Sequence, residues 1–121
     1  FGIEQRDYLV KHARSAQAKL SINNVSFIEG NFTQADFNNY DHFYFFNSFF
    51  ENLFDEDRID DSVAYSESLY DYYTRYLYNF LRERRSGTRV VTYHTLWNEV
   101  PREYKLVESL DGGELNFWVR R

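Results

Sequence analysis

The sequence contains no cysteine and no methionine, and only one of its 121 residues is proline. Without cysteine the chain cannot form a disulfide, bind a metal through thiolates or use a thiol nucleophile. It also has no signal-peptide core and no apolar run approaching the roughly eighteen residues that span a membrane. We therefore expect a soluble cytoplasmic protein that does not enter a membrane.

The absence of methionine also bears on where the chain begins. The first residues, Phe1-Gly2-Ile3-Glu4, resemble the end of a strand and leave no room for the rest of it. We expect that the chain starts inside an element. On this interpretation it is a fragment or an N-terminally trimmed form of a longer protein.

Aromatic residues are abundant, with twelve Phe and eleven Tyr, and 43% of the residues are hydrophobic. Such a composition predicts a packed core rather than disorder. The net charge of −5 disfavours nucleic acid as a partner. Arg82, Arg84 and Arg85 can form a local basic patch, or they can be the solvated cations that favour a helix end.

Hydrophobic periodicity predicts the order of the elements. Apolar residues at three- and four-residue spacing predict helices at roughly 6–21 and 61–85, and roughly 49–58 is irregular or a short helix. Strands are predicted near 1–4, 25–28, 40–46, 88–94, 104–110 and 114–119. Strands that alternate with helices imply a mostly parallel sheet, whereas Asp111-Gly112-Gly113 predicts an antiparallel hairpin at the end of the chain. The aromatic run 40–46 predicts a strand covered on both faces.

Three short segments and this hairpin together carry a resemblance. They are Gly2-Ile3-Glu4 before a helix, Phe27-Ile28-Glu29-Gly30-Asn31-Phe32, and Tyr40-Asp41-His42-Phe43-Tyr44-Phe45-Phe46-Asn47-Ser48-Phe49. Their order and spacing are similar to the class I S-adenosylmethionine-dependent methyltransferases from the second strand onward. The resemblance implies an α/β fold with a mostly parallel, doubly wound Rossmann-like sheet and a C-terminal antiparallel hairpin. Residues 1–121 would be the C-terminal two-thirds of a single such domain.

The first strand of that family and the glycine-rich loop after it have no counterpart in this sequence. The family's strand order is 3-2-1-4-5-7-6, so the first strand lies in the middle of the sheet. Its absence would separate strands two and three from the rest and leave unpaired backbone groups. We therefore expect that the chain does not fold autonomously, and that an upstream segment or another chain fills the gap.

Glu4 is the first candidate for cofactor binding. It lies at the carboxyl end of a predicted strand, where open α/β sheets bind ligands, and a carboxylate accepts hydrogen bonds from ribose hydroxyls. The resemblance assigns it this role. The alternative is a solvated carboxylate that favours the start of a helix.

Asn31 and Phe32 stand where the family commonly has an acid that contacts the adenine amine and an apolar residue that packs on the ring. Asn31 replaces the usual Asp, and its amide oxygen can still accept from the amine. Phe32 can stack on adenine. The alternative is a turn asparagine and a core phenylalanine.

Asn47 ends the next strand, beside which the family places the methyl group. Asn47-Ser48-Phe49-Phe50 is similar to the Asn-Pro-Pro-Tyr motif of amino methyltransferases but lacks both prolines. Methyl transfer depends mostly on alignment and exclusion of water, so no single catalytic residue is required. The candidates with useful chemistry are Asn47, Tyr44, Tyr93 and His94, of which His94 can serve as a base. The alternative for each is a structural role.

The functional hypothesis is a methyl transfer from S-adenosylmethionine to a small molecule or a protein side chain. One alternative is a catalytically inactive methyltransferase-like module that binds proteins, supported by Asn31, Ser48 and exposed aromatics. Another is a nicotinamide dinucleotide-binding domain, whose second strand also ends in an acid. His12, His42 and His94 lack metal-ligand spacing, and the sequence leaves the oligomeric state open.

Overall fold

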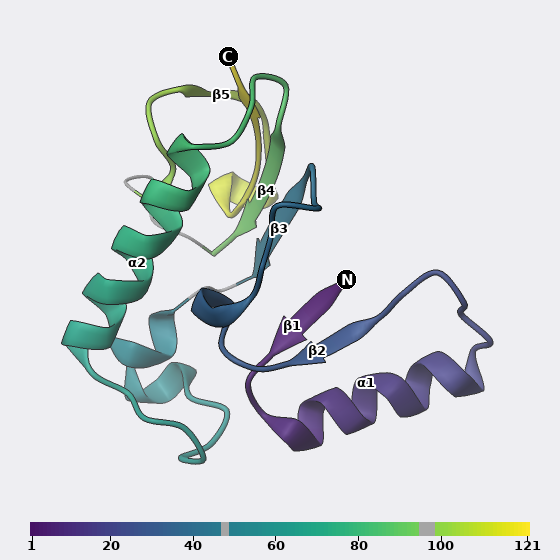
Figure 1. The fold of residues 1–121 in the computed structure, drawn as a ribbon. Helices are drawn as coiled ribbons and strands as arrows, with labels where there is room; N and C mark the ends of the chain where they lie inside the picture. Colours follow the sequence, from purple (N-terminus) through teal and green to yellow (C-terminus); the bar gives the residue numbers. More distant parts are fainter. Residues whose placement is uncertain (47–48, 95–98) are drawn as a thin grey trace. The chain divides into compact units, whose positions relative to one another are not determined.

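The computed structural model describes residues 1–46, 49–94 and 99–121 (Figure 1). By its internal contacts the chain divides into two compact units, Phe1–Phe37 and Asn38–Arg121. They are called unit 1 and unit 2 below, and each is described by itself.

Unit 1 is a strand–helix–strand segment with a short 3₁₀ turn. Its elements are β1 (Gly2–Glu4), α1 (Asp7–Lys19), β2 (Phe27–Glu29) and η1 (Phe32–Gln34). The two strands are parallel, and their register pairs Gly2 with Phe27 and Glu4 with Glu29. Parallel pairing requires a crossover, which α1 supplies. Val10 of α1 is buried, so the apolar stripe of this helix forms the unit's small core.

Two glycines allow this local geometry. A Cβ atom on Gly2 would lie 3.1 Å from the ring of Phe27, so any other residue at this position requires that ring to shift. Gly30 has a φ of 151°, which side chains rarely adopt, and its N–H donates to the carbonyl of Glu4 at 3.0 Å. Gly30 thereby ends β2 and brings Asn31 to the same edge as Glu4.

Unit 2 contains a four-stranded sheet and one long helix. Its elements are β3 (Phe43–Phe46), η2 (Phe50–Asn52), η3 (Asp55–Asp57), α2 (Glu67–Arg82), β4 (Arg89–Tyr93), β5 (Tyr104–Leu110), η5 (Asp111–Gly113) and β6 (Leu115–Arg120). The strand order is β3-β4-β6-β5. β3 and β4 are parallel, whereas β6 is antiparallel to both β4 and β5.

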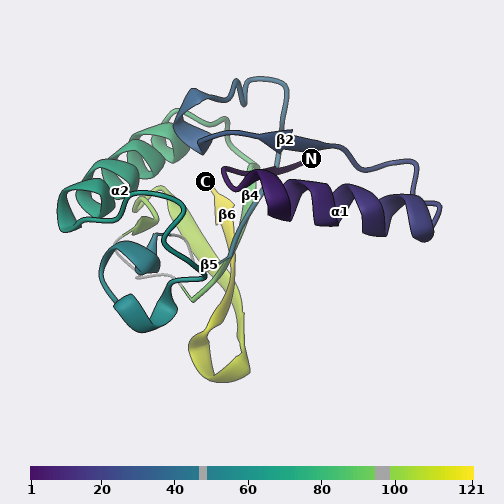
Figure 2. The same ribbon diagram turned by 90° about the horizontal axis from the view of Figure 1, so that it is seen from below.

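Helix α2 packs on one face of this sheet (Figures 1 and 2). The rings of Phe43 and Phe80 meet edge to face at 5.0 Å, and the hydroxyl of Tyr104 donates to the carbonyl of Leu81 at 3.1 Å. The core between helix and sheet contains apolar side chains that are at most 8% exposed: Leu77, Leu81, Val90, Tyr104 and Trp118. Burial of these side chains is the main force that holds α2 on the sheet.

The prediction of one mostly parallel, doubly wound Rossmann-like sheet is wrong. The described strands form two separate sheets, one of two parallel strands and one of four mixed strands. No described strand pairs with both β1 and β3, so nothing joins the two sheets by backbone hydrogen bonds. In unit 2 the last strand inserts between β4 and β5, which makes two of the three pairings there antiparallel.

The predicted strand 40–46 is also partly wrong. The strand begins at Phe43, because Asp41 forms an ion pair with Arg85 and His42 Nδ1 accepts a hydrogen bond from Arg89 N at 3.1 Å. It is not covered on both faces, since Tyr44 and Phe46 are 61% and 63% exposed.

The second helix is shorter than predicted. Ser66 is its N-cap, and the Ser66 hydroxyl accepts from Leu69 N at 3.1 Å, which starts α2 at Glu67 rather than near 61. The other strands and the terminal hairpin lie where the sequence predicts them, and residues 49–58 contain the short helical turns η2 and η3. Among the described helices, none is long and apolar enough to cross a membrane.

Candidate functional site

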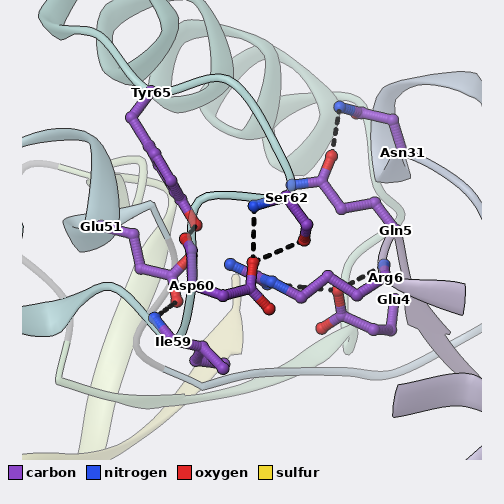
Figure 3. A network of polar contacts seen from close by, with 9 residues as sticks. All are labelled: Glu4, Gln5, Arg6, Asn31, Glu51, Ile59, Asp60, Ser62 and Tyr65. Carbon is purple, nitrogen blue, oxygen red and sulfur yellow. Dashed lines mark hydrogen bonds and ion pairs between the residues drawn. The ribbon is translucent and has the colours of Figure 1, made fainter. Parts of the chain in front are cut away.

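Glu4 lies at the carboxyl end of β1, as predicted (Figure 3). Its Oε1 accepts from Arg6 N at 2.8 Å and lies 3.3 Å from Arg6 Nη1. Arg6 is the N-cap residue of α1, so the carboxylate satisfies a backbone donor at the start of the helix. The side chain of Glu4 is 34% exposed, and its contacts with Arg6 N and Arg6 Nη1 both use Oε1. Glu4 thus has a structural role and keeps the capacity to bind a hydroxyl.

Asn31 and Phe32 lie at the carboxyl end of β2, beside Glu4 at the same edge. Asn31 Oδ1 accepts from Thr33 N at 3.0 Å and from Thr33 Oγ1 at 2.8 Å, which caps η1. Its Nδ2 points toward Gln5 Oε1 at 3.5 Å (Figure 3). Both lone pairs of the amide oxygen are therefore used, and contact with an adenine amine requires the Thr33 hydroxyl to turn away. The ring of Phe32 packs against Phe37 at 6.4 Å.

Glu29 is a residue of this edge that sequence reasoning missed. It is the last residue of β2, is exposed and pairs in register with Glu4. Neighbouring residues of parallel strands project to the same face, so two carboxylates lie side by side at this strand end. The signal in the sequence is its position directly before Gly30, which ends the strand.

A small hollow of about 260 Å³ lies between β1 and α1. Its lining is apolar apart from Glu4 and comprises Gly2, Ile3, Glu4, Leu9, Val10, Ala13 and Phe27. Ligand pockets usually measure roughly 300–1,000 Å³. This hollow is therefore smaller than a usual ligand pocket, and a cofactor bound at it would extend beyond it.

In unit 2 the candidate base His94 directly follows β4. It is exposed, has a φ of 52°, and its Nε2 lies 3.8 Å from Glu114 Oε2. The ring of its neighbour Tyr93 contacts it in a tilted arrangement, with ring centres 4.3 Å apart and 48° between the planes. The Tyr93 hydroxyl donates to Asp111 Oδ2 at 3.0 Å. That hydrogen bond raises the pKa of Tyr93, so its hydroxyl stays protonated and acts as a donor.

Two other predicted residues cannot be placed. Asn47 and Ser48 lie outside the described residues, so the proposed motif at the end of β3 stays a prediction. Tyr44, the remaining candidate in that segment, projects from β3 and is 61% exposed.

Glu99 is a second residue that sequence reasoning missed. It is 1% exposed, and its Oε1 accepts from the Tyr70 hydroxyl at 2.9 Å. Burial, together with the carboxylate of Glu99, raises the pKa of Tyr70 to about 12. No periodic pattern marks this glutamate, because it falls between the predicted strands.

The turn before α2 is organised by local hydrogen bonds (Figure 3). Asp60 Oδ1 accepts from Ser62 N at 2.8 Å, and Glu51 Oε1 accepts from Ile59 N at 3.1 Å. Each carboxylate accepts a hydrogen bond from a backbone N–H of the loop, so both stabilise the conformation of the loop. Within residues 1–46, 49–94 and 99–121, no group of three or more His, Asp or Glu side chains can hold a metal ion.

Comparison with known proteins identifies no relative: no family model, no curated protein and no solved structure matches the chain. What the site binds is therefore proposed from the chemistry of its own residues.

Proposed function

We propose that the chain is part of an S-adenosylmethionine-dependent methyltransferase that acts on a small molecule or a protein side chain. One observation carries the proposal. Glu4 and the Asn31-Phe32 pair come from different ends of a 29-residue segment, yet they lie at the same carboxyl edge of two parallel strands in unit 1. This edge is where α/β sheets bind nucleotides.

The strand order of unit 2 adds support from a separate part of the chain. The order β3-β4-β6-β5 is the same as the order four-five-seven-six of the corresponding strands in the family that the sequence resembles. The insertion of the last strand beside β4 also disfavours the nicotinamide dinucleotide alternative. A cytoplasmic location belongs to the proposal as well.

The residues present fit the nucleoside part of this cofactor. Glu4 would accept hydrogen bonds from the ribose hydroxyls, since its contacts with Arg6 use Oε1 and its side chain is 34% exposed. Phe32 would pack on the adenine ring, and Asn31 would accept from the adenine amine after losing its bond to the Thr33 hydroxyl. When bound, the cofactor supplies an electrophilic methyl group on a sulfonium. His94, in unit 2, stays a sequence-based candidate for a general base.

The test is calorimetric titration of S-adenosylhomocysteine into the protein and into Glu4→Ala and Glu4→Gln. We expect micromolar binding that weakens tenfold or more, about 1.4 kcal/mol, in both variants. Glu4→Gln keeps an acceptor for Arg6 N and therefore separates loss of the ribose contact from loss of the helix cap. Asp7→Ala, an exposed carboxylate of the same unit, is the matched control and should leave binding unchanged.

Absence of binding by a folded protein would refute the proposal and favour the second candidate, a catalytically inactive module that binds proteins. A specific observation supports that candidate. The oxygen of Asn31 is already engaged by Thr33, and large aromatic side chains of β3 are exposed. Equal binding by wild type and both Glu4 variants would mean that the cofactor does not bind at this edge.

A further inference from the structure

The four-stranded sheet of unit 2 has one face that α2 does not cover (Figures 1 and 2). The strand registers arrange its side chains in three rows across the sheet. We call this surface the open face, and its residues are Arg89, Val119 and Lys105 in the first row, Tyr44, Val91, Phe117 and Glu108 in the second, and Phe46, Tyr93, Leu115 and Leu110 in the third.

The second and third rows are apolar except at one edge. Tyr44, Phe46 and Leu110 are 61%, 63% and 46% exposed. The rings of Phe46 and Tyr93 stack at 5.4 Å with an angle of 19° between their planes. On the α2 side, by contrast, Val90 and Trp118 are at most 8% exposed. A continuous aromatic surface of this kind marks a site of interaction.

The two ends of the open face carry opposite charges. Arg89 and Lys105 lie in the first row and are exposed. Beyond the third row lie Asp111, which accepts from the Tyr93 hydroxyl, and Glu114, beside His94. Glu108 is exposed at the β5 edge, where water reaches it. The charge therefore changes sign along the strand direction.

We propose that the open face packs against the open face of a second copy of this chain, with the strands of the two copies running in opposite directions. A two-fold axis across the strands puts the first row of each copy over the third row of the other. Arg89 then faces the ring of Tyr93 in the other copy, Lys105 faces Leu110, and both cations approach the carboxylates beyond the third row. The symmetry forms each contact twice. Packing with the strands in the same direction would oppose like charges instead.

The size of the open face predicts a weak dimer. The face is four strands wide, at about 4.8 Å between strands, and about five residues long, at about 3.3 Å per residue. Its area is therefore smaller than the roughly 800 Å² per partner of a standard interface. Two such faces pack about 10 Å apart with their strands within about 30° of each other. We expect dissociation constants in the micromolar range, so dimers form only in concentrated solution.

The experiment measures molecular mass by sedimentation equilibrium between about 5 and 500 µM protein, a range that brackets micromolar affinity. The wild type should change from monomer to dimer, and Phe46→Glu should stay monomeric at the highest concentration. Phe54→Glu is the matched control, since Phe54 is 54% exposed in unit 2 but lies outside the sheet. It should dimerise as the wild type does.

A charge exchange tests the orientation of the two copies. Arg89→Glu and Glu114→Lys should each weaken dimerisation at least tenfold, and the double variant should recover most of the loss. A monomeric wild type at the highest concentration overturns the proposal, as does a dimer that Phe46→Glu leaves intact. Failure of the double variant to recover overturns the opposed orientation. Each variant is first checked for a native circular dichroism spectrum, and none of these outcomes depends on cofactor binding.

Discussion

Two tyrosines of unit 2 have hydroxyl groups whose ionisation their surroundings oppose. Tyr104 is 6% exposed, and its hydroxyl donates to the carbonyl of Leu81. Burial raises the pKa of Tyr104 to about 12. Burial and, to a smaller extent, the carboxylate of Glu99 raise the pKa of Tyr70 to about 12. Both values are above the pKa of about 10 for a tyrosine in an unfolded chain.

These two pKa values predict how stability depends on alkaline pH. Above pH 10 the unfolded chain loses protons that the folded chain keeps, so the free energy of unfolding falls as the pH rises. The contribution is fully present below pH 10 and is lost as the pH rises through about 12. Tyrosinate absorbance, followed against pH, should show a late phase near pH 12 to which Tyr70 and Tyr104 contribute, and Tyr104→Phe should reduce this phase by one tyrosine.

Tyr72→Phe is the control for this titration, since Tyr72 is 53% exposed on α2. It should remove absorbance from the early phase and leave the late phase intact. If Tyr104→Phe also removed only early absorbance, the hydroxyl of Tyr104 would not be buried in the protein in solution.

At the level of single residues, the sequence predicts only part of the candidate site. Glu4 is found from sequence because an acid directly after a short apolar run falls at a strand end. The hydrogen bond from Thr33 N to Asn31 Oδ1 depends on the backbone conformation of the residues that follow Gly30. An Asn that accepts from the backbone N–H two residues later is nevertheless typical of such turns. Glu99 gives no signal, because its burial depends on the packing of distant elements.

At the scale of elements, the hairpin of β5 and β6 depends on one buried amide. Asn116 is 2% exposed, its Nδ2 donates to the carbonyl of Gly113 at 2.7 Å, and its Oδ1 accepts from Ser109 Oγ at 2.7 Å. Asn116→Ala removes both hydrogen bonds and leaves Gly113 without this donor. We expect a loss of about 1–3 kcal/mol in the free energy of unfolding, measured by urea denaturation.

Asn79→Ala provides the comparison for that change. Asn79 is exposed on α2, and alanine is the better helix former, so the free energy of unfolding should change by about 0.5 kcal/mol or less. An equally small effect of Asn116→Ala would mean that the turn alone holds the hairpin.

The hairpin is predicted correctly, whereas β3 is not, and the difference has a physical cause. Asp111-Gly112-Gly113 is a local signal, since the turn geometry needs residues that tolerate positive φ, and Asp111 and both glycines adopt it. The aromatic run ending at Phe46 is ambiguous. Apolar residues on both faces of a strand do not reveal which face another element covers, and here Tyr44 and Phe46 are the exposed ones.

For the whole molecule, the division into two units predicts unequal local stability. Among the described residues of unit 1, Val10 is the one buried apolar side chain, and both strands are three residues long. A segment this small has little core to stabilise it. Amide hydrogen exchange should therefore be at least about tenfold faster in β1 and β2 than in β4 and β6.

Mass spectrometry of peptides from a timed exchange reaction measures this difference. Equal protection of the two sheets would contradict it and would mean that units 1 and 2 open together.

The pairing of strands across the whole chain is the least predictable level. A helix between two strands indicates that the two strands are parallel, and the structure has two such pairs, β1 with β2 and β3 with β4. Whether two pairs join into one sheet depends on a strand that pairs with both, and local patterns carry no information about such long-range hydrogen bonds.

The two outer strands of the larger sheet differ in how they resist aggregation. β5 carries a bulge between Leu106 and Glu108, and a bulge together with exposed Lys105 and Glu108 prevents a foreign strand from adding to that edge. β3 has neither a bulge nor a charge in its sequence Phe-Tyr-Phe-Phe. Four aromatic residues without a charge are a template for cross-β stacking. Insoluble material formed during storage or heating would therefore begin at β3, and an added lysine in that strand would delay it.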